Sequence, residues 1–334
     1  MKKTLFIRIK SKKDFKKLEQ AAKIIKKGNL VAFPTETVYG LGANALDSKA
    51  VSGIFKAKGR PSDNPLIVHI ADKKDVYKLT KEVPLEAEIL MKKFWPGPLT
   101  IVLKRKKIVP KIVSAGLNTV AIRMPKHDVA LELIKRAKVP IAAPSANVSG
   151  RPSPTSAKHV IHDLFGKIDA IIDGGEAEIG IESTVIDLSG EIPTLLRPGK
   201  ITPEQLEKEL GIVKIHGSLK GNKKVKVLIS KSPGMKYIHY APNAKVILVV
   251  GKNKNKIKKK IYLLSKNYKL KNKTIRIIEV RSLESFAKNI FRIFRGSDKK
   301  KIDVILVPGV EEKGLGLAIM NRLKKAASEI IRVR

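Results

Sequence analysis

The chain of 334 residues contains no cysteine and a single tryptophan, and aromatic residues make up only 5% of it. Without cysteine there is no disulfide, no thiolate nucleophile and no cysteine-based zinc or iron–sulfur site, so a protein-bound metal would need oxygen or histidine ligands. Uncharged apolar runs of membrane-spanning length are also absent, and Arg8 and Lys10 interrupt the apolar run near the start. We therefore expect a soluble, cytoplasmic protein with no membrane partner.

Acidic residues are scarce: 30 Asp and Glu stand against 69 Lys and Arg, which gives a formal net charge of +39. Such a charge attracts nucleotides, RNA and other polyanions. Lysine accounts for 55 of the 69 basic residues, and a lysine-rich surface also arises from compositional bias or heat tolerance. Residues 231–334 carry 27 basic and 7 acidic residues, so this part is about twice as basic per residue as the rest.

Several common catalytic motifs are missing as well. The chain has no Walker A loop, no H-E-x-x-H and no G-x-S-x-G, so the usual NTPase, zinc-protease and serine-hydrolase interpretations lose their main support. No residue is assigned as a metal ligand.

The first two-thirds of the chain alternate between two apolar patterns. Short runs rich in Val and Ile predict strands at 29–35, 66–71, 99–105, 120–125, 140–146, 170–175 and 184–188. Apolar residues at helical spacing predict helices at 14–28, 85–94, 127–137 and 155–165. The fold class is therefore mixed α/β.

A second regular pattern follows a segment rich in Gly, Ser, Pro and Lys. Residues 244–334 predict β-α-β-α-β-α, a small parallel sheet flanked by helices that resembles a Rossmann-like half. No G-x-G-x-x-G follows its first strand, so a dinucleotide site is not expected there. We predict a catalytic domain over 1–217, a linker over 218–243 and a C-terminal domain over 244–334.

Two polar segments of the first domain are candidates for ligand contact. PTETVYGLGANA (34–45) packs hydroxyls and glycines into a predicted turn, which lets backbone amides approach a small ligand, although a plain glycine turn is an equal alternative. In KAKGRPSDNPLIVHI (56–70), Lys58 and Arg60 on an extended segment would clamp a polyphosphate. K-x-R alone carries no signal in so basic a chain.

Two further segments carry anion-binding chemistry. APSANVSGRPSPTSAKHV (143–160) leads from a strand through Ser and Asn into a helix, which suits an anion, although it also fits an ordinary capped helix with a polar loop. Arg123 lies in an otherwise apolar strand and needs a partner there. A substrate carboxylate would serve, and so would Asp173 or Asp187.

The ordered set of these motifs resembles the YrdC-like threonylcarbamoyl-AMP synthase family, in its long two-domain form. The resemblance extends from about residue 12 to 328 and rests on PTETVYGLGANA, K-x-R with RPSDNPL, WPGPLT, AIRMP, PSAN, ESTVIDL, LLRPG, SPGMKYIHYAP and GLGLAIMNRLKKAA. It implies a YrdC-like twisted mixed sheet with helices, followed by the smaller domain. It also implies synthesis of L-threonylcarbamoyladenylate from L-threonine, bicarbonate and ATP with Mg²⁺, releasing pyrophosphate. This nucleotidyltransferase reaction is the first step of N6-threonylcarbamoyladenosine formation at position 37 of tRNA, and the product would pass to tRNA-modification enzymes.

The resemblance also assigns roles to residues. The catalytic group would be Lys58, Arg60, Ser145 and Asn147. Threonine would be held by Thr35, His69, Arg123, the main chain of Ala143, and Ser183. ATP would meet Arg60, Asn64, Thr119, Ser145, Ser153, Arg197 and His239. His239 and Tyr240 would close a lid over the site, or would instead pin the linker to the domain surface.

Two other interpretations remain open. An RNA-binding protein with a basic concave surface would account for the charge without chemistry, although the chain lacks an aromatic stripe. A carbamoyl transferase related to a hydrogenase maturation factor would share the fold, but such proteins are larger and carry cysteine-based zinc modules. Sequence alone does not decide the role of the C-terminal domain, the oligomeric state or the acceptor of the product.

Overall fold

The computed structural model describes residues 2–219 and 240–333. The chain divides into two compact units, one of residues Met1–Ser149 and Ser153–Lys236 and one of residues Gly150–Pro152 and Tyr237–Arg334. Most of the predicted linker, 220–239, lies outside the described residues, and so does His239. The domain boundaries given above stay a prediction.

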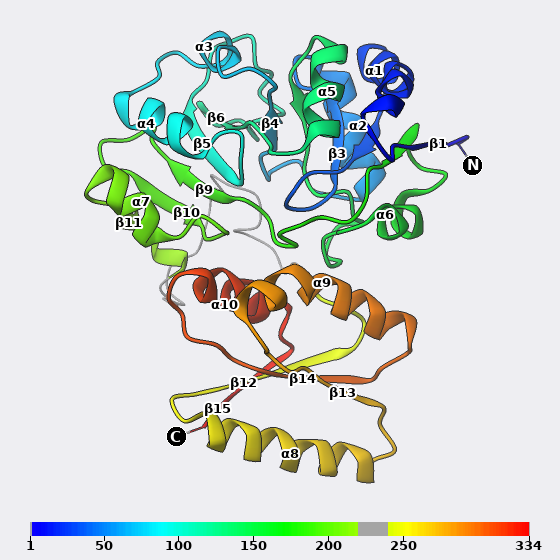
Figure 1. Ribbon diagram of the computed structural model, residues 1–334, viewed down its shortest axis with the longest axis vertical. Coiled ribbons are helices and arrows are strands. Elements are labelled where there is room, and N and C mark those ends of the chain that lie inside the picture. Colours follow the sequence, from blue (N-terminus) through cyan, green and yellow to red (C-terminus); the bar gives the residue numbers. More distant parts are fainter. Residues whose placement is uncertain (1, 220–239, 334) are drawn as a thin grey trace. The chain divides into compact units, whose positions relative to one another are not determined.

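The N-terminal unit contains a large sheet and helices (Figure 1). Its strands are β1 (Leu5–Arg8), β2 (Val31–Phe33), β3 (Gly40–Asn44), β4 (Ile67–His69), β5 (Leu99–Lys104), β6 (Thr119–Arg123), β7 (Ile141–Ala142), β8 (Ala170–Asp173), β9 (Thr184–Asp187), β10 (Thr194–Arg197) and β11 (Lys214–Ile215). Its helices are η1 (Lys12–Lys17), α1 (Leu18–Lys26), α2 (Ser48–Lys58), α3 (Asp75–Leu79), α4 (Leu85–Phe94), α5 (Asp128–Ala137), α6 (Ala157–Leu164), α7 (Pro203–Leu210) and η2 (Gly217–Leu219).

The strands form one mixed sheet in the order β1-β8-β2-β3-β7-β4-β6-β5-β9-β10-β11. β4 and β6 are parallel, whereas β7 runs antiparallel to β4 and β5 runs antiparallel to β6. Helices α1 and α5 lie side by side (Figure 1) and share an apolar core with residues of β1, β2, β7 and β8. The predicted mixed α/β class is confirmed.

Local sequence accounts for the helix ends next to the site. Asp47 caps α2 by accepting from the backbone N–H groups of Lys49 and Ala50. Gly59 ends the same helix in the left-handed conformation, with φ +59°, which glycine adopts without strain. α2 therefore stops at a fixed residue and presents Lys58 at its last position.

Two local expectations were wrong. Lys58 and Arg60 do not lie on an extended segment, because Lys58 ends α2 and Gly59 is its cap. The segment 34–45 is not only a turn, since it continues into β3. Residues 48–58 contain many small side chains, so their apolar residues show no clear helical spacing. The glycines of β3 likewise leave too few apolar residues for a strand pattern.

The C-terminal unit is a three-layer arrangement around a parallel sheet. Its strands are β12 (Lys245–Gly251), β13 (Ile275–Ile277), β14 (Val304–Pro308) and β15 (Glu329–Val333), in the order β13-β14-β12-β15, and its helices are α8 (Lys254–Leu270), α9 (Leu283–Lys299) and α10 (Leu315–Ala326). Figure 1 shows α9 and α10 on one face of this sheet and α8 on the other. The predicted parallel sheet is confirmed, with β15 as an added edge strand.

Within residues 2–219 and 240–333, no helix is both long enough and apolar enough to span a bilayer.

Candidate active site

The strands β4 and β6 place two predicted threonine-binding residues side by side. His69 and Arg123 are register partners at the carboxyl ends of these parallel strands, and both side chains are buried. The backbone N–H of Ala143 donates to the carbonyl of Ile67 at 2.8 Å, so the chain leaving β7 runs toward the opposite end of β4. Because β4 has only three residues, Ala143 lies close to His69, and the Phe33 ring, 5.9 Å from that of His69, lies between them.

Arg123 is held by three groups. Its Nη2 lies 2.6 Å from Oε2 of Glu36, its Nη1 donates to the Thr37 hydroxyl at 2.9 Å, and its Nε donates to the carbonyl of Gly97 at 3.2 Å. The structural partner is therefore Glu36, and neither Asp173 nor Asp187 serves. Each Nη carries two hydrogens, so the guanidinium keeps donor capacity for a ligand.

The segment 35–38 packs beside Arg123. The Thr35 hydroxyl donates to the carbonyl of Val38 at 2.6 Å and lies 2.8 Å from the Thr37 hydroxyl. Thr37 contacts Arg123 and Gly40 pairs with Ser145. Residues 37–40 therefore connect the surroundings of Arg123 with those of Ser145.

At the amino end of β4, Lys58, Ser145 and Asn147 form a group that we name the lysine cluster. The Lys58 ammonium, on a side chain with 2% exposure, donates to the carbonyls of Ser145 at 2.5 Å and of Asn147. The Ser145 hydroxyl donates to Oδ1 of Asn147 at 2.5 Å. A buried ammonium held by carbonyl oxygens is a localised positive charge in low dielectric, where an anion gains most from it.

Arg60 and Asn64 lie at the same end. Nη2 of Arg60 donates to the carbonyl of Asn64 at 3.3 Å. The Asn64 side chain is fully buried, and its amide nitrogen and oxygen have no partner among the described residues. An unsatisfied buried amide costs free energy, so it points to a ligand group with both donor and acceptor.

Ser183 lies at the Arg123 end. Its hydroxyl is 2.8 Å from the Thr100 hydroxyl, and Arg197 donates both to the Ser183 carbonyl at 3.0 Å and to its hydroxyl at 3.1 Å. Thr184 pairs with Leu99 in parallel β9 and β5, which fixes Ser183 just before that pairing. Arg197, expected at the nucleotide, thus directly contacts a residue expected at threonine.

The remaining predicted residues are less closely grouped. Thr119 begins β6 and is separated from Arg123 by the strand length of about 13 Å. The Ser153 hydroxyl donates to Oε1 of Glu182, which precedes Ser183. Tyr240 lies in the C-terminal unit, where its ring stacks on Phe291 with centroids 5.1 Å apart.

Sequence reasoning assigned no role to four residues that build these contacts: Glu36, Thr37, Thr100 and Glu182. For the two glutamates, the available signal was an acidic residue inside an otherwise uncharged motif of a chain that has few acids. A buried carboxylate in such a motif requires a cation, and Arg123 was a cation in need of a partner.

Burial sets the protonation of the site. The pKa of His69 is lowered to about 3, first by desolvation and then by the Arg123 cation. His69 is therefore neutral at physiological pH, and its buried Nδ1 has no partner in the described ranges. Burial also lowers the pKa of His127, against the charge of Glu36 and Glu178. A neutral imidazole can exchange a hydrogen bond with a substrate hydroxyl without adding charge.

Comparisons with known proteins place this site in a family. Residues 23–199 match the Sua5/YciO/YrdC family, described as "Telomere recombination", and residues 201–328 match the domain described as "Threonylcarbamoyl-AMP synthase, C-terminal domain". The chain belongs to the Sua5/YciO/YrdC family. The two matches together extend over most of the chain, as in the long, two-domain members of this family.

Individual members are similar along nearly the whole chain. The threonylcarbamoyl-AMP synthase of Pyrococcus abyssi is 52% identical, with 99% of this chain and 100% of that protein covered. The enzyme of the same name from Bacillus subtilis is 46% identical over 93% of this chain and 92% of its own length. A crystal structure of Pyrococcus abyssi Sua5 complexed with L-threonine superposes with a TM-score of 0.93, at 51% identity and 99% coverage of both chains.

Proposed function

We propose that this chain is an L-threonylcarbamoyladenylate synthase of the cytoplasm. L-Threonine, bicarbonate and ATP give L-threonylcarbamoyladenylate, pyrophosphate and water. The threonine nitrogen forms a bond to the bicarbonate carbon as water leaves, and a carbamate oxygen then displaces pyrophosphate from the α-phosphorus. The product serves the first step of N6-threonylcarbamoyladenosine formation at position 37 of tRNA, and is handed to tRNA-modification enzymes.

One observation carries this proposal: the chain aligns from end to end with relatives named threonylcarbamoyl-AMP synthase. The geometry supports it, because one short segment joins the two sites: Thr37 contacts Arg123, and Gly40 pairs with Ser145, whose carbonyl holds Lys58. A carbamate that attacks the α-phosphorus needs the amino-acid and phosphate sites to be adjacent in this way. The carbamoyl-transferase alternative loses support, since the chain has no cysteine for zinc modules.

At the Arg123 end, the guanidinium binds the threonine carboxylate while Glu36 and Thr37 keep it in place. Neutral His69 and the hydroxyls of Thr35 and Ser183 bind the threonine hydroxyl. The main chain of Ala143, which pairs with Ile67 at the other end of the three-residue strand β4, is the remaining threonine contact. Binding in a fixed orientation brings the amine to bicarbonate. The carbamate then reacts with the α-phosphorus before it can lose carbon dioxide.

At the other end, Lys58 and Arg60 neutralise the charge that develops on departing pyrophosphate. Ser145 and Asn147 fix the Lys58 ammonium, and we assign both to the reacting carbamate. Asn64, Thr119, Ser153 and Arg197 contact the nucleotide; Asn64 lies beside Arg60, whereas Ser153 and Arg197 bind Glu182 and Ser183, next to the threonine contacts. The unpartnered amide of Asn64 is the best placed of the four to bind a base or ribose group.

Mg²⁺ enters this scheme with the nucleotide. In the part of the chain that the structure describes, no group of three or more His, Asp or Glu side chains could hold a metal ion. Mg²⁺ retains several waters and is bound largely by substrate phosphates, so we assign it to the bound nucleotide.

His239 and Tyr240 were expected either to close a lid over the site or to pin the linker to the domain surface. His239 lies outside the described residues, and Tyr240 adopts φ +72° with its ring buried against Phe291 and under the Arg322 guanidinium, 6.0 Å from the ring centroid. These contacts support the alternative in which Tyr240 anchors the linker.

The decisive experiment measures pyrophosphate release by the purified full-length protein with ATP, Mg²⁺, bicarbonate and one amino acid at a time. We expect release that needs both threonine and bicarbonate, with serine far less effective. Release that is independent of bicarbonate would exclude carbamate formation and refute the proposed reaction.

A further inference from the structure

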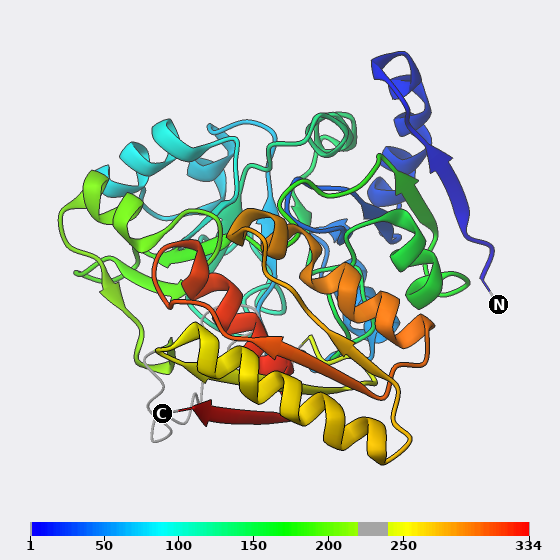
Figure 2. The same cartoon turned by 60° about the horizontal axis from the view of Figure 1, so that its bottom comes forward.

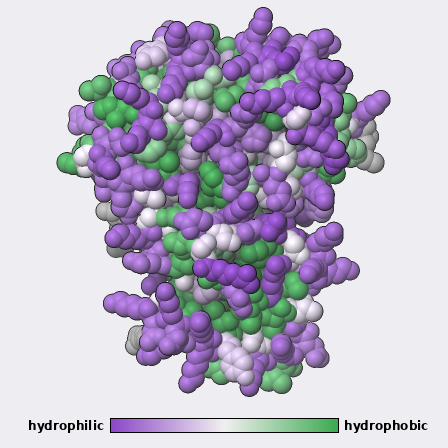
Figure 3. All heavy atoms as spheres, viewed as in Figure 1, coloured by the Kyte–Doolittle hydropathy of each residue, from purple (hydrophilic) through white to green (hydrophobic). Residues whose placement is uncertain are grey.

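The helix α8 of the C-terminal unit carries an unusual concentration of positive charge. Seven of its 17 residues are lysine and none is acidic, and all but the half-buried Lys260 are exposed: Lys254, Lys256, Lys258, Lys259, Lys260, Lys266 and Lys269. The surrounding segment 252–276 holds ten Lys and one Arg without a single Asp or Glu. In Figure 3 the lower edge, where Figure 1 places α8, shows hydrophilic side chains with apolar ones between them.

The lysines of α8 differ from two other lysines of the C-terminal unit, which form ion pairs with acidic residues. Lys245 pairs with Glu329 and Lys273 pairs with Asp303. Among residues 2–219 and 240–333, by contrast, no carboxylate forms an ion pair with a lysine of α8. The lysines of α8 therefore remain available to an external anion.

The arrangement also works against the stability of α8. Lys254 with Lys258 and Lys256 with Lys260 are like-charged i,i+4 pairs, and the first turn has cations but no acid at the positive end of the helix dipole. Helices α1, α4, α5, α7 and α9 each carry an acid in their first turn. Compositional bias acts on every helix, so it does not explain why α8 alone among the long helices combines this density of lysine with no acid.

The apolar stripe of α8 is already occupied. Ile257 and Ile261 are buried with Ile247, Val304 and Leu306 of the sheet, and Figure 2 shows α8 crossing the strands on that face. A helix that binds a bilayer needs a continuous free apolar face. The outer side of α8 exposes three large apolar side chains, those of Tyr262, Leu263 and Leu270, with Lys266 between them. This charge interrupts the apolar area, which disfavours a membrane surface as the partner.

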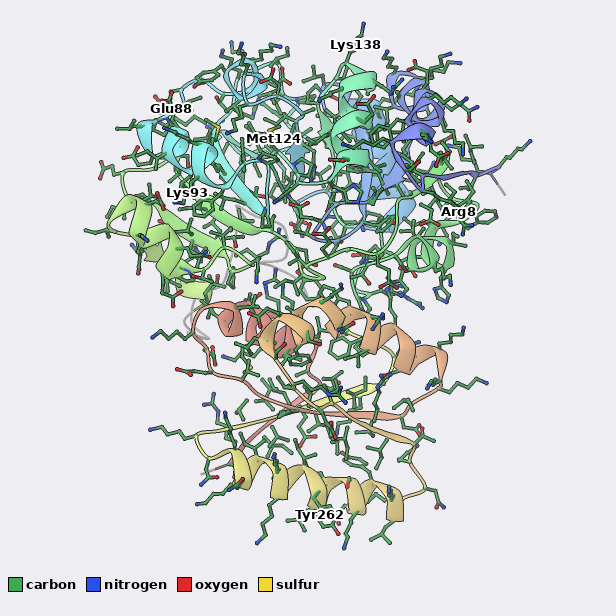
Figure 4. All side chains as sticks on the ribbon, in the orientation of Figure 1. Arg8, Glu88, Lys93, Met124, Lys138 and Tyr262 are labelled. Carbon is green, nitrogen blue, oxygen red and sulfur yellow. The ribbon has the colours of Figure 1, made fainter. Side chains whose placement is uncertain are left out.

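Of the two tyrosines of α8, Tyr268 packs against the core of the unit, whereas Tyr262 lies exposed among the lysines. Tyr262 is 56% exposed and projects from the side of α8 away from the sheet (Figure 4), with the Lys266 ammonium 4.8 Å from its ring centroid. An exposed ring beside cations offers a stacking surface for a base next to contacts for phosphates. Seventeen helical residues span about 25 Å, which is long enough to follow several consecutive phosphates.

We propose that the outer face of α8, with Lys256, Lys259, Lys266 and Tyr262 at its centre, is a docking surface for the phosphate backbone of RNA. The choice of RNA among polyanions rests on the proposed function, whose product serves the modification of tRNA. This surface holds RNA near the enzyme that makes the adenylate and takes no part in adenylate synthesis.

The test compares two triple variants that each remove three positive charges. One is K256Q/K259Q/K266Q on α8, and the control is K23Q/K26Q/K27Q at the end of α1. Binding of a fluorescent in vitro tRNA transcript is followed by anisotropy over a series of KCl concentrations. We expect the α8 variant to bind at least about tenfold more weakly and its log–log salt slope to flatten by about 2 to 3, with the control close to wild type. Equal losses in both variants would show a general charge effect and overturn the docking surface.

Two further arms separate the possible causes. Y262A should weaken binding about fivefold or more while the salt slope stays unchanged, because stacking releases no counterions. Anionic phosphatidylserine vesicles should not bind the protein; vesicle binding that α8 substitutions abolish, without tRNA binding, would replace RNA by a membrane. Pyrophosphate release by the α8 variant should equal that of wild type. Loss of tRNA binding with no threonine-dependent release in any protein would retain the surface and refute the proposed function instead.

Discussion

Lys58 has the environment of a residue that acts by charge. It is nearly fully buried and held by the carbonyls of Ser145 and Asn147, whereas Lys56, two positions before it on α2, is exposed. Replacing a preorganised cation at a site of developing negative charge typically lowers turnover by 10² or more. We expect Lys58→Ala to slow pyrophosphate release about 100-fold or more and Lys56→Ala to leave it unchanged. Similar rates in the two variants would remove Lys58 from the mechanism.

Glu36 acts on the substrate through Arg123. Breaking a buried ion pair is strongly destabilising, by about 3–5 kcal/mol, and the pair of Glu36 with Arg123 is buried on both sides. We expect Glu36→Gln, which keeps the size of the side chain, to raise KM for threonine while KM for ATP stays near wild type. Folding is checked by circular dichroism. Equal increases in both KM values would indicate a general structural defect rather than a role at the amino acid.

His69 makes the stability of the protein depend on pH. Its folded-state pKa of about 3 lies below the ordinary value of 6.5, so below pH 6.5 the unfolded chain binds a proton that the folded protein does not. Its contribution to stability is full above pH 6.5 and falls by about 1.4 kcal/mol per pH unit on acidification toward pH 3. We measure the free energy of unfolding in urea from about pH 4 to about pH 6.5. It should fall less steeply on acidification in His69→Gln than in wild type. Parallel slopes would contradict the assignment.

Among the elements, the turn from β10 to α7 depends on one glycine. A Cβ added at Gly199 would overlap the backbone nitrogen of Thr184, at the start of β9 and next to Ser183. Gly190 has no atom within 4 Å of such a Cβ. We therefore expect Gly199→Ala to destabilise the protein by about 2 kcal/mol or more and to impair threonine binding, and Gly190→Ala to stay within about 0.5 kcal/mol of wild type. Thermal unfolding of the two variants tests this, and equal midpoints would refute it.

The elements also show which parts of the fold a pattern predicts. α4 and α5 were expected almost residue for residue, because their apolar spacing is regular and they end where the pattern ends. α2 and β3 were not, since small residues and glycines carry little hydrophobic signal. The consequence was an error at the site itself, where Lys58 and Arg60 were expected on an extended segment.

For the molecule as a whole, the net charge of +39 produces self-repulsion that salt screens. The Debye length falls from tens of ångströms at low salt to below about 10 Å above 0.1 M. We expect KCl, raised from about 20 mM to about 300 mM, to increase the urea midpoint of unfolding. The α8 triple variant should gain less from the same salt. A midpoint that falls with salt would show that attractive ion pairs outweigh the repulsion.

The sequence by itself determined the fold class, the two regular patterns and the residue types of the site, because periodicity and ordered motifs are properties of the chain alone. It also identified Arg123 as a cation in need of a partner, but it offered Asp173 and Asp187. Only the tertiary structure decided that Glu36 is that partner, that the Ser145–Asn147 loop encloses Lys58, and that Arg197 contacts Ser183. Each of these contacts joins residues more than a dozen positions apart in the chain, and strand order and register, which fix such distances, are set by how the strands pack together rather than by any local pattern.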